Sequence, residues 1–168
     1  FMARFESPAA LAAAPIESLL DLWAGLGYYS RARNLHRAAT EVVEAHGGIV
    51  PNTPEAFAAL AGVGRYTCGA VQSIAFGHRV PVVDGNVERV LCRLDRFVDD
   101  PRNAAGKRWV WGRAGQFADH AQPGDVNQAL MELGATVCTP RNPRCGDCPL
   151  AESCLANAHG DPATLPFK

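Results

Sequence analysis

The spacing of apolar residues along this chain predicts helices in almost every part of it. Ser7 followed by Pro8 is typical of a helix start, because Ser caps free N–H groups and Pro suits the first helical position. Pro15 opens a second helix, with apolar residues expected on one face at Ile16, Leu19, Leu20, Trp23 and Leu26. Gly25 and Gly27 are expected to end this helix.

Three more helices are predicted before the middle of the chain. One begins at about residue 30 and stops at the glycine pair Gly47-Gly48. A short helix starts at Thr53-Pro54 and ends near Leu60. Another is predicted over residues 65–76, directly after a tight turn that contains two glycines.

The second half of the chain has the same character. Residues 80–83 form a short extended apolar run, where one or two strands are conceivable, but nothing indicates a sheet. Asp84 then opens a helix to about Phe97, and a polar loop at 99–106 separates it from two further helices, near 107–120 and 125–136. The predicted fold class is therefore all-α.

Four cysteines follow the last predicted helix, at Cys138, Cys145, Cys148 and Cys154. Four thiols in so short a segment are a natural metal-ligand set. Zinc sites mostly use two separated C-x2-C pairs, whereas this C-x6-C-x2-C-x5-C pattern has one such pair with a single cysteine on each side. The spacing favours an iron–sulfur cluster over zinc. Arg141 and Arg144 lie between the first two cysteines and give that loop positive charge.

Composition restricts the function classes. The chain has 168 residues, enough for one core or one core with a small satellite module. Its formal net charge is −1, which argues against nucleic-acid binding by bulk charge alone but allows a local basic patch. We find no membrane-length apolar stretch and no signal peptide, so an intracellular protein without membrane association is expected. Because Phe1 lies within a pattern rather than before it, we expect that an N-terminal part is missing.

Two segments have the residue types of a functional site. The turn Gly62-Val63-Gly64 precedes a helix, where N–H groups and the helix dipole favour an anion such as a DNA phosphate; a purely steric helix corner would explain the glycines equally well. Asp84 is either a plain helix cap or an ionised carboxylate facing a developing positive charge, and these roles are compatible. Asn86 is placed to orient it.

Basic and aromatic residues cluster in two further places. Tyr28 and Arg31 suit base stacking and phosphate contact, although an amphipathic helix with a solvated basic face is the alternative. On the helix after Asp84, a plain solvated or ion-paired face is expected for Arg89, Arg93 and Arg96. Elsewhere, Cys68 and Cys92 fall at apolar positions and are expected to be buried small hydrophobic residues.

Together these stretches resemble the helix-hairpin-helix DNA glycosylase superfamily, and within it the adenine DNA glycosylases of the MutY type. The resemblance covers nearly the whole chain. It is carried by the cysteine loop, residues 22–31 (LWAGLGYYSR), 62–67 (GVGRYT), 83–87 (VDGNV) and 127–135 (NQALMELGA). It implies a six-helix barrel domain over 1–100, with the hairpin at about 54–77, and an iron–sulfur domain over 101–168, with its loop at 138–154.

The resemblance also implies an activity and roles for individual residues. Such enzymes flip adenine mispaired with 8-oxoguanine out of double-stranded DNA and cleave its N-glycosidic bond. Asp84 would be the catalytic carboxylate, assisted by Asn86. Tyr66 occupies the position of the Schiff-base lysine in the endonuclease III branch, so imine chemistry is not expected and Tyr66 would shape the base pocket. The residues implied to contact DNA are Gly62, Val63, Gly64, Arg65, Thr67, Tyr28 and Arg31.

Several further expectations follow from the same resemblance. The cysteines would hold a [4Fe–4S] cluster, and the protein would act as a monomer in the nucleoid of a bacterium or in the nucleus or mitochondrion of a eukaryote. The family's general-acid glutamate has no counterpart in these residues, so this segment alone is expected to be weakly active or inactive. Two alternatives stay open: a thymine or uracil mismatch glycosylase of the same fold, and a catalytically impaired DNA-binding fragment.

Overall fold

The computed structural model describes residues 1–167, and within them it contains helices and connecting loops but no strand. The chain forms two compact units, one from Phe1 to Cys68 and the other from Gly69 onward. The domain boundary expected after residue 100 was inferred from the resemblance to a family and not from compactness. It therefore stays a prediction beside this division. None of the helices in the described part is both long and apolar enough to cross a membrane.

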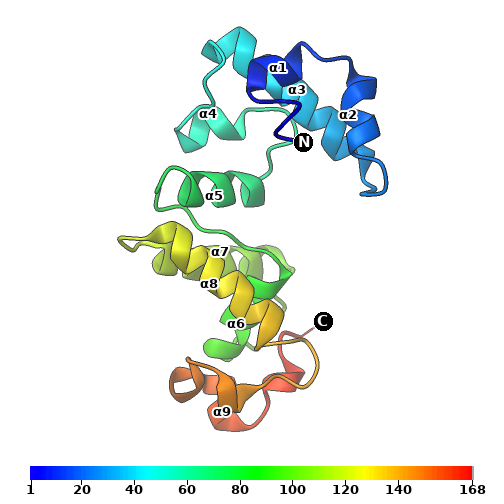
Figure 1. Cartoon of the computed structure of the whole chain (residues 1–168). Helices are drawn as coiled ribbons and strands as arrows, with labels where there is room; N and C mark the ends of the chain where they lie inside the picture. The colour runs from blue at the N-terminus through cyan, green and yellow to red at the C-terminus, as the bar shows by residue number, and fades with distance from the viewer. Residues whose placement is uncertain (168) are drawn as a thin grey trace. The chain divides into compact units, whose positions relative to one another are not determined.

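The N-terminal unit is built around one long helix. α3 (Tyr29–His46) packs against α1 (Pro8–Ala12) and α2 (Ile16–Leu22), as Figure 1 shows. It ends at Gly47, which adopts a left-handed conformation (φ 62°) as predicted from the glycine pair. The core of this unit is small and apolar, consisting of Phe5, Leu11, Leu19, Ala32 and Ala39.

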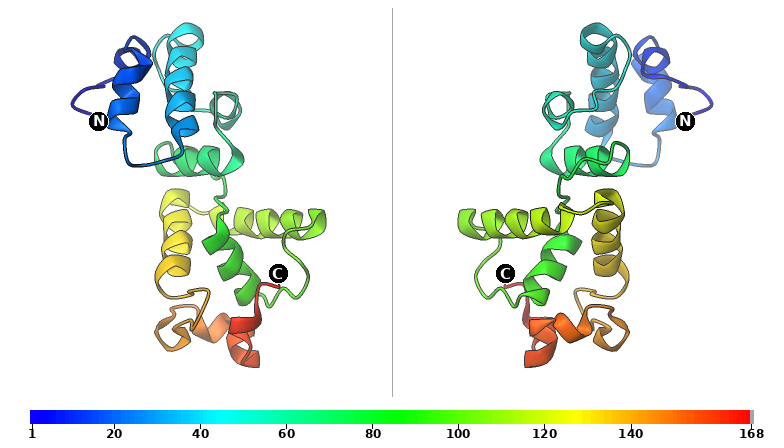
Figure 2. Two further views of the ribbon diagram at one scale, coloured as in Figure 1. Left: turned by 90° about the vertical axis from the view of Figure 1, so that its right-hand side faces the viewer. Right: turned by 90° about the vertical axis from the view of Figure 1, so that its left-hand side faces the viewer.

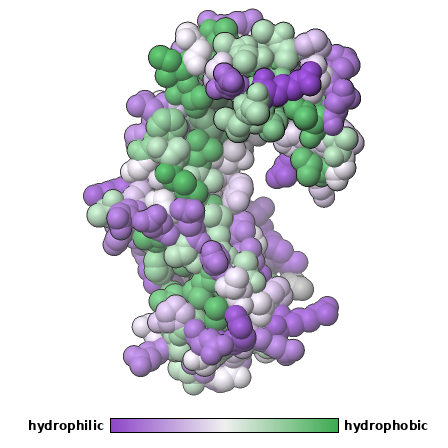
Figure 3. Space-filling view, viewed as in Figure 1, coloured by the Kyte–Doolittle hydropathy of each residue, from purple (hydrophilic) through white to green (hydrophobic). Residues whose placement is uncertain are grey.

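The apolar face predicted for the second helix is only partly correct. Leu19 is fully buried, but α2 already ends at Leu22, and Leu26 lies in the following loop with 68% of its surface exposed. Trp23 is the C-cap of α2, and Gly25 with φ 86° follows it in the loop, so Leu26 does not continue the helix face. Apolar side chains consequently appear among the polar ones on the surface of this unit (Figure 3).

α4 and α5 surround the predicted glycine turn. α4 (Pro54–Ala58) is capped by the Thr53 side chain, and α5 (Arg65–Ile74) begins directly after Gly64. The first residues of α5 belong to the N-terminal unit and its later residues to the C-terminal unit. α5 was predicted to reach Phe76; it ends two residues earlier.

The C-terminal unit is organised around α6 (Gly85–Leu94), which packs against three other helices. These are α7 (Ala104–Ala118), α8 (Pro123–Thr136) and α9 (Leu155–His159). Figure 2 shows α7 running crosswise to α8 within this unit. Apolar residues at the helical spacing of α6 enter the core, which consists of Val87, Val90, Leu91, Cys92, Val110, Ala114 and Leu130. The expected burial of Cys68 and Cys92 is confirmed.

The cysteine segment contains only short helical turns. They are η1 (Cys145–Asp147) and η2 (Ala151–Ser153), and a third turn, η3 (Pro162–Thr164), follows α9. The segment therefore follows α8 as a loop, as the sequence predicted.

One glycine of α7 offers a direct test of this packing. A Cβ added at Gly106 would meet the carbonyl oxygen of Asp100 and lie 2.5 Å from the Cα of Pro101, whereas a Cβ at Gly112 of the same helix has no atom within 4 Å. We expect Gly106→Ala to lower the free energy of unfolding by about 1–3 kcal/mol, because backbone must shift. Gly112→Ala should instead raise it by up to about 1 kcal/mol, since Ala favours helix. Thermal unfolding of both variants measures this difference, and equal effects would contradict the packing.

Candidate active site and metal centre

Asp84 caps α6 with its own carboxylate. Its Oδ1 accepts hydrogen bonds from the backbone N–H groups of Asn86 (2.9 Å) and Val87 (2.8 Å), and its extended backbone (φ −116°, ψ −175°) is typical of a cap residue. A carboxylate at this place also interacts favourably with the positive end of the helix dipole. Asp84 is half-buried. The capping role considered for Asp84 is therefore confirmed, and it leaves Oδ2 for a second role.

Asn86 connects that second oxygen to an arginine. Its Nδ2 donates to Asp84 Oδ2 at 3.1 Å, and its Oδ1 accepts from Arg89 Nη2 at 2.7 Å. Arg89 Nη2 also donates to the carbonyl of Gly134, and its Nε donates to the carbonyl of Cys138 at 2.7 Å. Burial and the neighbouring charge of Arg93 lower the pKa of Arg89, while Asp84 acts in the opposite direction. A continuous set of hydrogen bonds thus runs from the candidate carboxylate to the first cysteine.

The glycine turn in the N-terminal unit packs tightly on α3. Gly62 has φ 73°, and a Cβ there would lie 2.5 Å from the Cβ of Asn34. The N–H of Ala61 donates to the Glu41 carboxylate at 2.7 Å. Gly62 is therefore required both by its positive φ and by the close approach of α3. The steric explanation of this glycine holds, and it is compatible with phosphate contact by the same turn.

The residues after the turn begin α5. Arg65, Tyr66 and Thr67 occupy its first helical turn, where N–H groups point away from the helix and the dipole favours an anion. The Tyr66 side chain is partly exposed, so its ring is accessible. This geometry suits a helix start that faces a phosphate.

The loop before α3 presents an aromatic residue to solvent. Tyr28 has φ 47° and is 80% exposed, and the Arg31 guanidinium lies 5.9 Å from the centre of its ring. Trp23 Nε1 donates to the carbonyl of Gly27 at 3.0 Å and holds the loop closed. An aromatic ring this exposed contributes little to packing, and its position suits insertion between bases.

The four terminal cysteines are brought together in the C-terminal unit. All four are free, half-buried thiols. Burial raises the pKa of Cys145, and the nearby thiols of Cys138, Cys154 and Cys148 raise it further, while Arg93 acts in the opposite direction. Cys138 Sγ and Cys154 Sγ each lie 3.4 Å from an atom of Arg93, so the first and last cysteines of the segment meet at that residue.

Arg93 lies beneath this cysteine loop and is almost completely buried, with 1% of its surface exposed. Its side chain donates to the carbonyls of Thr139 (2.7 Å) and Leu165 (3.0 Å), and Nη1 lies 3.4 Å from Cys138 Sγ. Further carbonyl acceptors are those of Pro140 and Cys138. A buried guanidinium is stabilised by negative charge nearby, which cysteine thiolates bound to a cluster would supply.

The donor set fits an iron–sulfur cluster. Cysteine thiolates are the usual ligands of such clusters, and four half-buried cysteines lie in one loop segment, with the buried Arg93 beside Cys138. In the described residues, no group of three side chains from His, Cys, Asp and Glu is placed to hold a single metal ion. Cys138, Cys145, Cys148 and Cys154 are the candidate cluster ligands.

The expectation of a plain solvated or ion-paired arginine face on α6 is wrong for two of its three members. Arg93 is buried and Arg89 binds the backbone of the cysteine loop, and only Arg96 forms an ordinary ion pair, with Asp161 at 2.8 Å. Except for Gly85, which Arg89 also contacts, the carbonyls that these arginines bind lie 45 or more residues further along the chain. In the sequence, the only feature that could have indicated these contacts was the position of Arg89 and Arg93 on the helix that follows Asp84.

These features together define a helical protein with a glycine hairpin, a carboxylate at a helix start and a cluster-binding loop, an arrangement characteristic of one class of DNA repair proteins. Residues 1–113 match the HhH-GPD superfamily of base excision DNA repair proteins, and residues 138–154 match the iron–sulfur binding domain of endonuclease III. The chain belongs to the HhH-GPD superfamily.

Proteins named adenine DNA glycosylase are among the sequence relatives. The protein from Homo sapiens is 54% identical over 147 residues, which is 87% of this chain and 27% of the relative. The protein from Arabidopsis thaliana is 48% identical, covering 81% of this chain and 21% of the relative. The protein from Mycobacterium tuberculosis is 41% identical, covering 88% of this chain and 48% of the relative. The chain thus spans between about a fifth and a half of the length of the curated relatives it matches.

Solved structures confirm the predicted all-α helix-hairpin-helix glycosylase fold. A thermostable thymine-DNA glycosylase superposes with a TM-score of 0.83 at 27% identity, covering 95% of this chain and 73% of the other. A trapped endonuclease III–DNA covalent intermediate gives 0.75 at 26% identity, with the same coverage. Both likenesses extend over nearly all of the chain.

The roles of Arg93 and Arg96, near the C-terminal end of α6, can be separated experimentally. We expect Arg93→Met to lower the iron and sulfide content of the purified protein and to destabilise it by at least about 3 kcal/mol, because buried carbonyls lose their donors. Visible absorption and iron analysis of anaerobically purified protein measure the first effect, and thermal unfolding measures the second.

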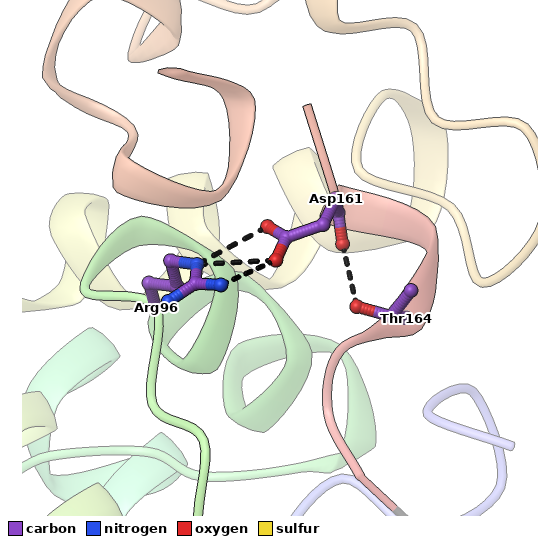
Figure 4. Close-up of polar contacts among 3 residues, drawn as sticks. All are labelled: Arg96, Asp161 and Thr164. Carbon is purple, nitrogen blue, oxygen red and sulfur yellow. Dashed lines mark hydrogen bonds and ion pairs between the residues drawn. The ribbon is translucent and has the colours of Figure 1, made fainter. Parts of the chain in front are cut away.

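Arg96→Met is the matched control, at an arginine that lies just after the C-terminal end of α6. Figure 4 shows Arg96 paired with Asp161, whose carbonyl also accepts from Thr164. The hydrogen bond from Arg96 lowers the pKa of Asp161, so the pair stabilises the fold at neutral pH and loses this effect as the pH falls below the ordinary range of an aspartate. Its loss should leave iron content unchanged. Equal iron loss in both variants would contradict the role of Arg93.

Proposed function

We propose that the parent protein is a DNA glycosylase that removes adenine mispaired with 8-oxoguanine or guanine by hydrolysing its N-glycosidic bond. The observation that carries the proposal is the Asp84 carboxylate, held at the start of α6 by two N–H groups and by Asn86. The adenine DNA glycosylases of several organisms, 54% identical in the human case, support adenine as the base. The activity is proposed for the parent because this chain spans only part of those relatives.

Asp84 suits the chemistry of base loss. Departure of a purine leaves positive charge on the sugar, and an ionised carboxylate stabilises that charge or traps it covalently. The two N–H donors and the positive end of the helix dipole hold and stabilise a carboxylate at this position. Asn86 fixes the direction of Oδ2 through its 3.1 Å hydrogen bond. Protonation of the leaving adenine is assigned to a glutamate outside residues 1–168.

DNA would be held by residues of the N-terminal unit. We assign phosphate contact to the backbone of Gly62, Val63 and Gly64 and to the start of α5, with Arg65 and Thr67 beside them. The exposed ring of Tyr28 is assigned to insertion between bases, and Arg31 to a phosphate. Tyr66, which carries no amine, would line the base pocket without forming an imine.

The four cysteines would hold a [4Fe–4S] cluster. When bound, the cluster would supply negative charge and four fixed anchor points to the loop, and no step of base removal is assigned to it. Arg93 and Arg89 would hold the loop backbone from below. We further propose a monomer that acts on double-stranded DNA without a membrane, in the nucleoid, the nucleus or the mitochondrion.

A thymine or uracil mismatch glycosylase is the second candidate. The superposition with a thymine-DNA glycosylase at a TM-score of 0.83 favours it. Sequence identity is about twice as high to the human adenine enzyme, 54% against 27%, and this supports adenine. Release of thymine from a T:G duplex, without release of adenine from an A:8-oxoguanine duplex, would establish the second candidate.

The decisive variant for the proposal is Asp84→Asn in the full-length parent. Asn caps a helix as well as Asp, so folding should be preserved, but a neutral amide gives little stabilisation to a cationic sugar. We expect single-turnover release of adenine from an A:8-oxoguanine duplex to fall by at least about 100-fold.

Asp125→Asn is the matched control, because Asp125 is an exposed aspartate in the first turn of α8. It should release adenine at the wild-type rate. The assignment of Asp84 fails if its asparagine variant also keeps that rate. A parent that binds DNA but releases no base would instead indicate a catalytically impaired DNA-binding protein.

A further inference from the structure

The extended run before Asp84 needs hydrogen-bond partners that no sheet supplies. Residues 80–83 lie outside any helix or strand, and Val82 is fully buried. Buried backbone groups are almost always paired, and an unpaired one destabilises the conformation that buries it. The conformation of this run therefore depends on whatever element pairs with its N–H and carbonyl groups.

Asn127 of α8 is that partner. Its Oδ1 accepts from the N–H of Val82 at 3.2 Å, and its Nδ2 donates to the carbonyl of Val80 at 2.9 Å and to Ser73 Oγ at 2.9 Å. The side-chain amide thus bonds to the run as a neighbouring strand would, with one acceptor and one donor. Turning the amide over would place a donor against the Val82 N–H, so its orientation is defined by these partners.

Burial and spacing show that α8 is fitted to this task. Asn127 is 1% exposed, and both polar atoms of its side chain are hydrogen-bonded to these three partners. Two glycines on the same helix allow close approach on either side of it. A Cβ at Gly124 would lie 2.8 Å from the Cα of Ile74, and one at Gly134 would lie 2.6 Å from the Cβ of Asn86.

The positions 124, 127 and 134 repeat with helical spacing and share one face of α8. That face contacts the end of α5, the extended run and the start of α6 in turn. The backbone that precedes Asp84 is consequently held by α8. The Asp84 carboxylate is held by the N–H groups at the start of α6.

We propose that Asn127 is a positioning residue for the Asp84 carboxylate, acting through the backbone of residues 80–83. Asn127 itself touches no reacting atom. Its side chain sets where the main chain arrives at Asp84, and a displacement of about 1 Å at a catalytic group is enough to lower a rate by about 100-fold. The inference rests on the proposed glycosylase function of Asp84.

The test compares two variants of α8 in the full-length parent. Asn127→Ala removes the hydrogen bonds to the run, while Leu130→Ala removes a buried core side chain one turn further on and keeps those bonds. Both should lower thermal stability. At a temperature where both are folded, we expect Asn127→Ala to lower the single-turnover rate of adenine release by about 10- to 100-fold, with Kd for a duplex bearing a non-cleavable adenine analogue within about twofold of wild type. Leu130→Ala should keep both values.

A second variant applies if Asn127→Ala does not fold. In Asn127→Asp, the protonated carboxyl retains one acceptor and one donor for Val82 and Val80, whereas the ionised form loses the donor. Its rate relative to wild type should therefore rise as the pH is lowered. A ratio that stays flat with pH would overturn the proposal, as would a rate for Asn127→Ala equal to that of Leu130→Ala.

Hydrogen exchange separates this inference from the proposed function. The Val82 amide should exchange faster in Asn127→Ala than in wild type and Leu130→Ala. If the wild-type parent releases no adenine, the proposed function fails while this exchange still tests the pairing. Unchanged exchange at Val82 in a folded Asn127→Ala protein overturns the role of Asn127 whatever the activity.

Discussion

The pairing of a carboxylate with the N-terminus of α6 is the interaction on which the rest of the C-terminal unit depends. Asp84 caps the helix, and the positive end of the helix dipole in turn stabilises the carboxylate, so the fold and the proposed chemistry use the same atoms. Four residues of the next turns, Val87, Val90, Leu91 and Cys92, then bury themselves in the core. The cap at Asp84 and the buried apolar face thereby fix both the rotation of α6 about its axis and its position along that axis within the unit.

The other side of α6 is held by polar contacts of unusual burial. Arg93 lies beneath the cysteine loop and donates to the carbonyl of Thr139. Arg89 binds the carbonyl of Cys138 and also Asn86, so it connects that loop to the start of the helix. These arginines bind backbone carbonyls, which depend on the path of the loop rather than on its side chains. A cluster bound by the four cysteines would fix that path. The loop and the carboxylate thus share one rigid support.

Much of this could be predicted from local sequence. Caps such as Ser7, Thr53 and Asp84 and the glycines at 47 and 48 define helix ends within a few residues, because each acts on its nearest backbone groups. The burial of Arg93 could not be predicted in this way. Its partners lie between 45 and 72 residues away in sequence, and an arginine at a helical position is solvated in most proteins. The role of Asn127 could not be predicted for the same reason. Leu26 was assigned to the face of a helix that already ends at Leu22.

The central claim is that α6 is the common support of the cysteine loop and of Asp84. Hydrogen exchange of cluster-loaded protein and of protein from which iron has been chelated tests it directly. The account predicts that removal of the cluster speeds amide exchange not only at 138–154 but also along α6, including the Asn86 and Val87 amides that bind Asp84. Faster exchange confined to the cysteine loop, with α6 unchanged, would contradict it.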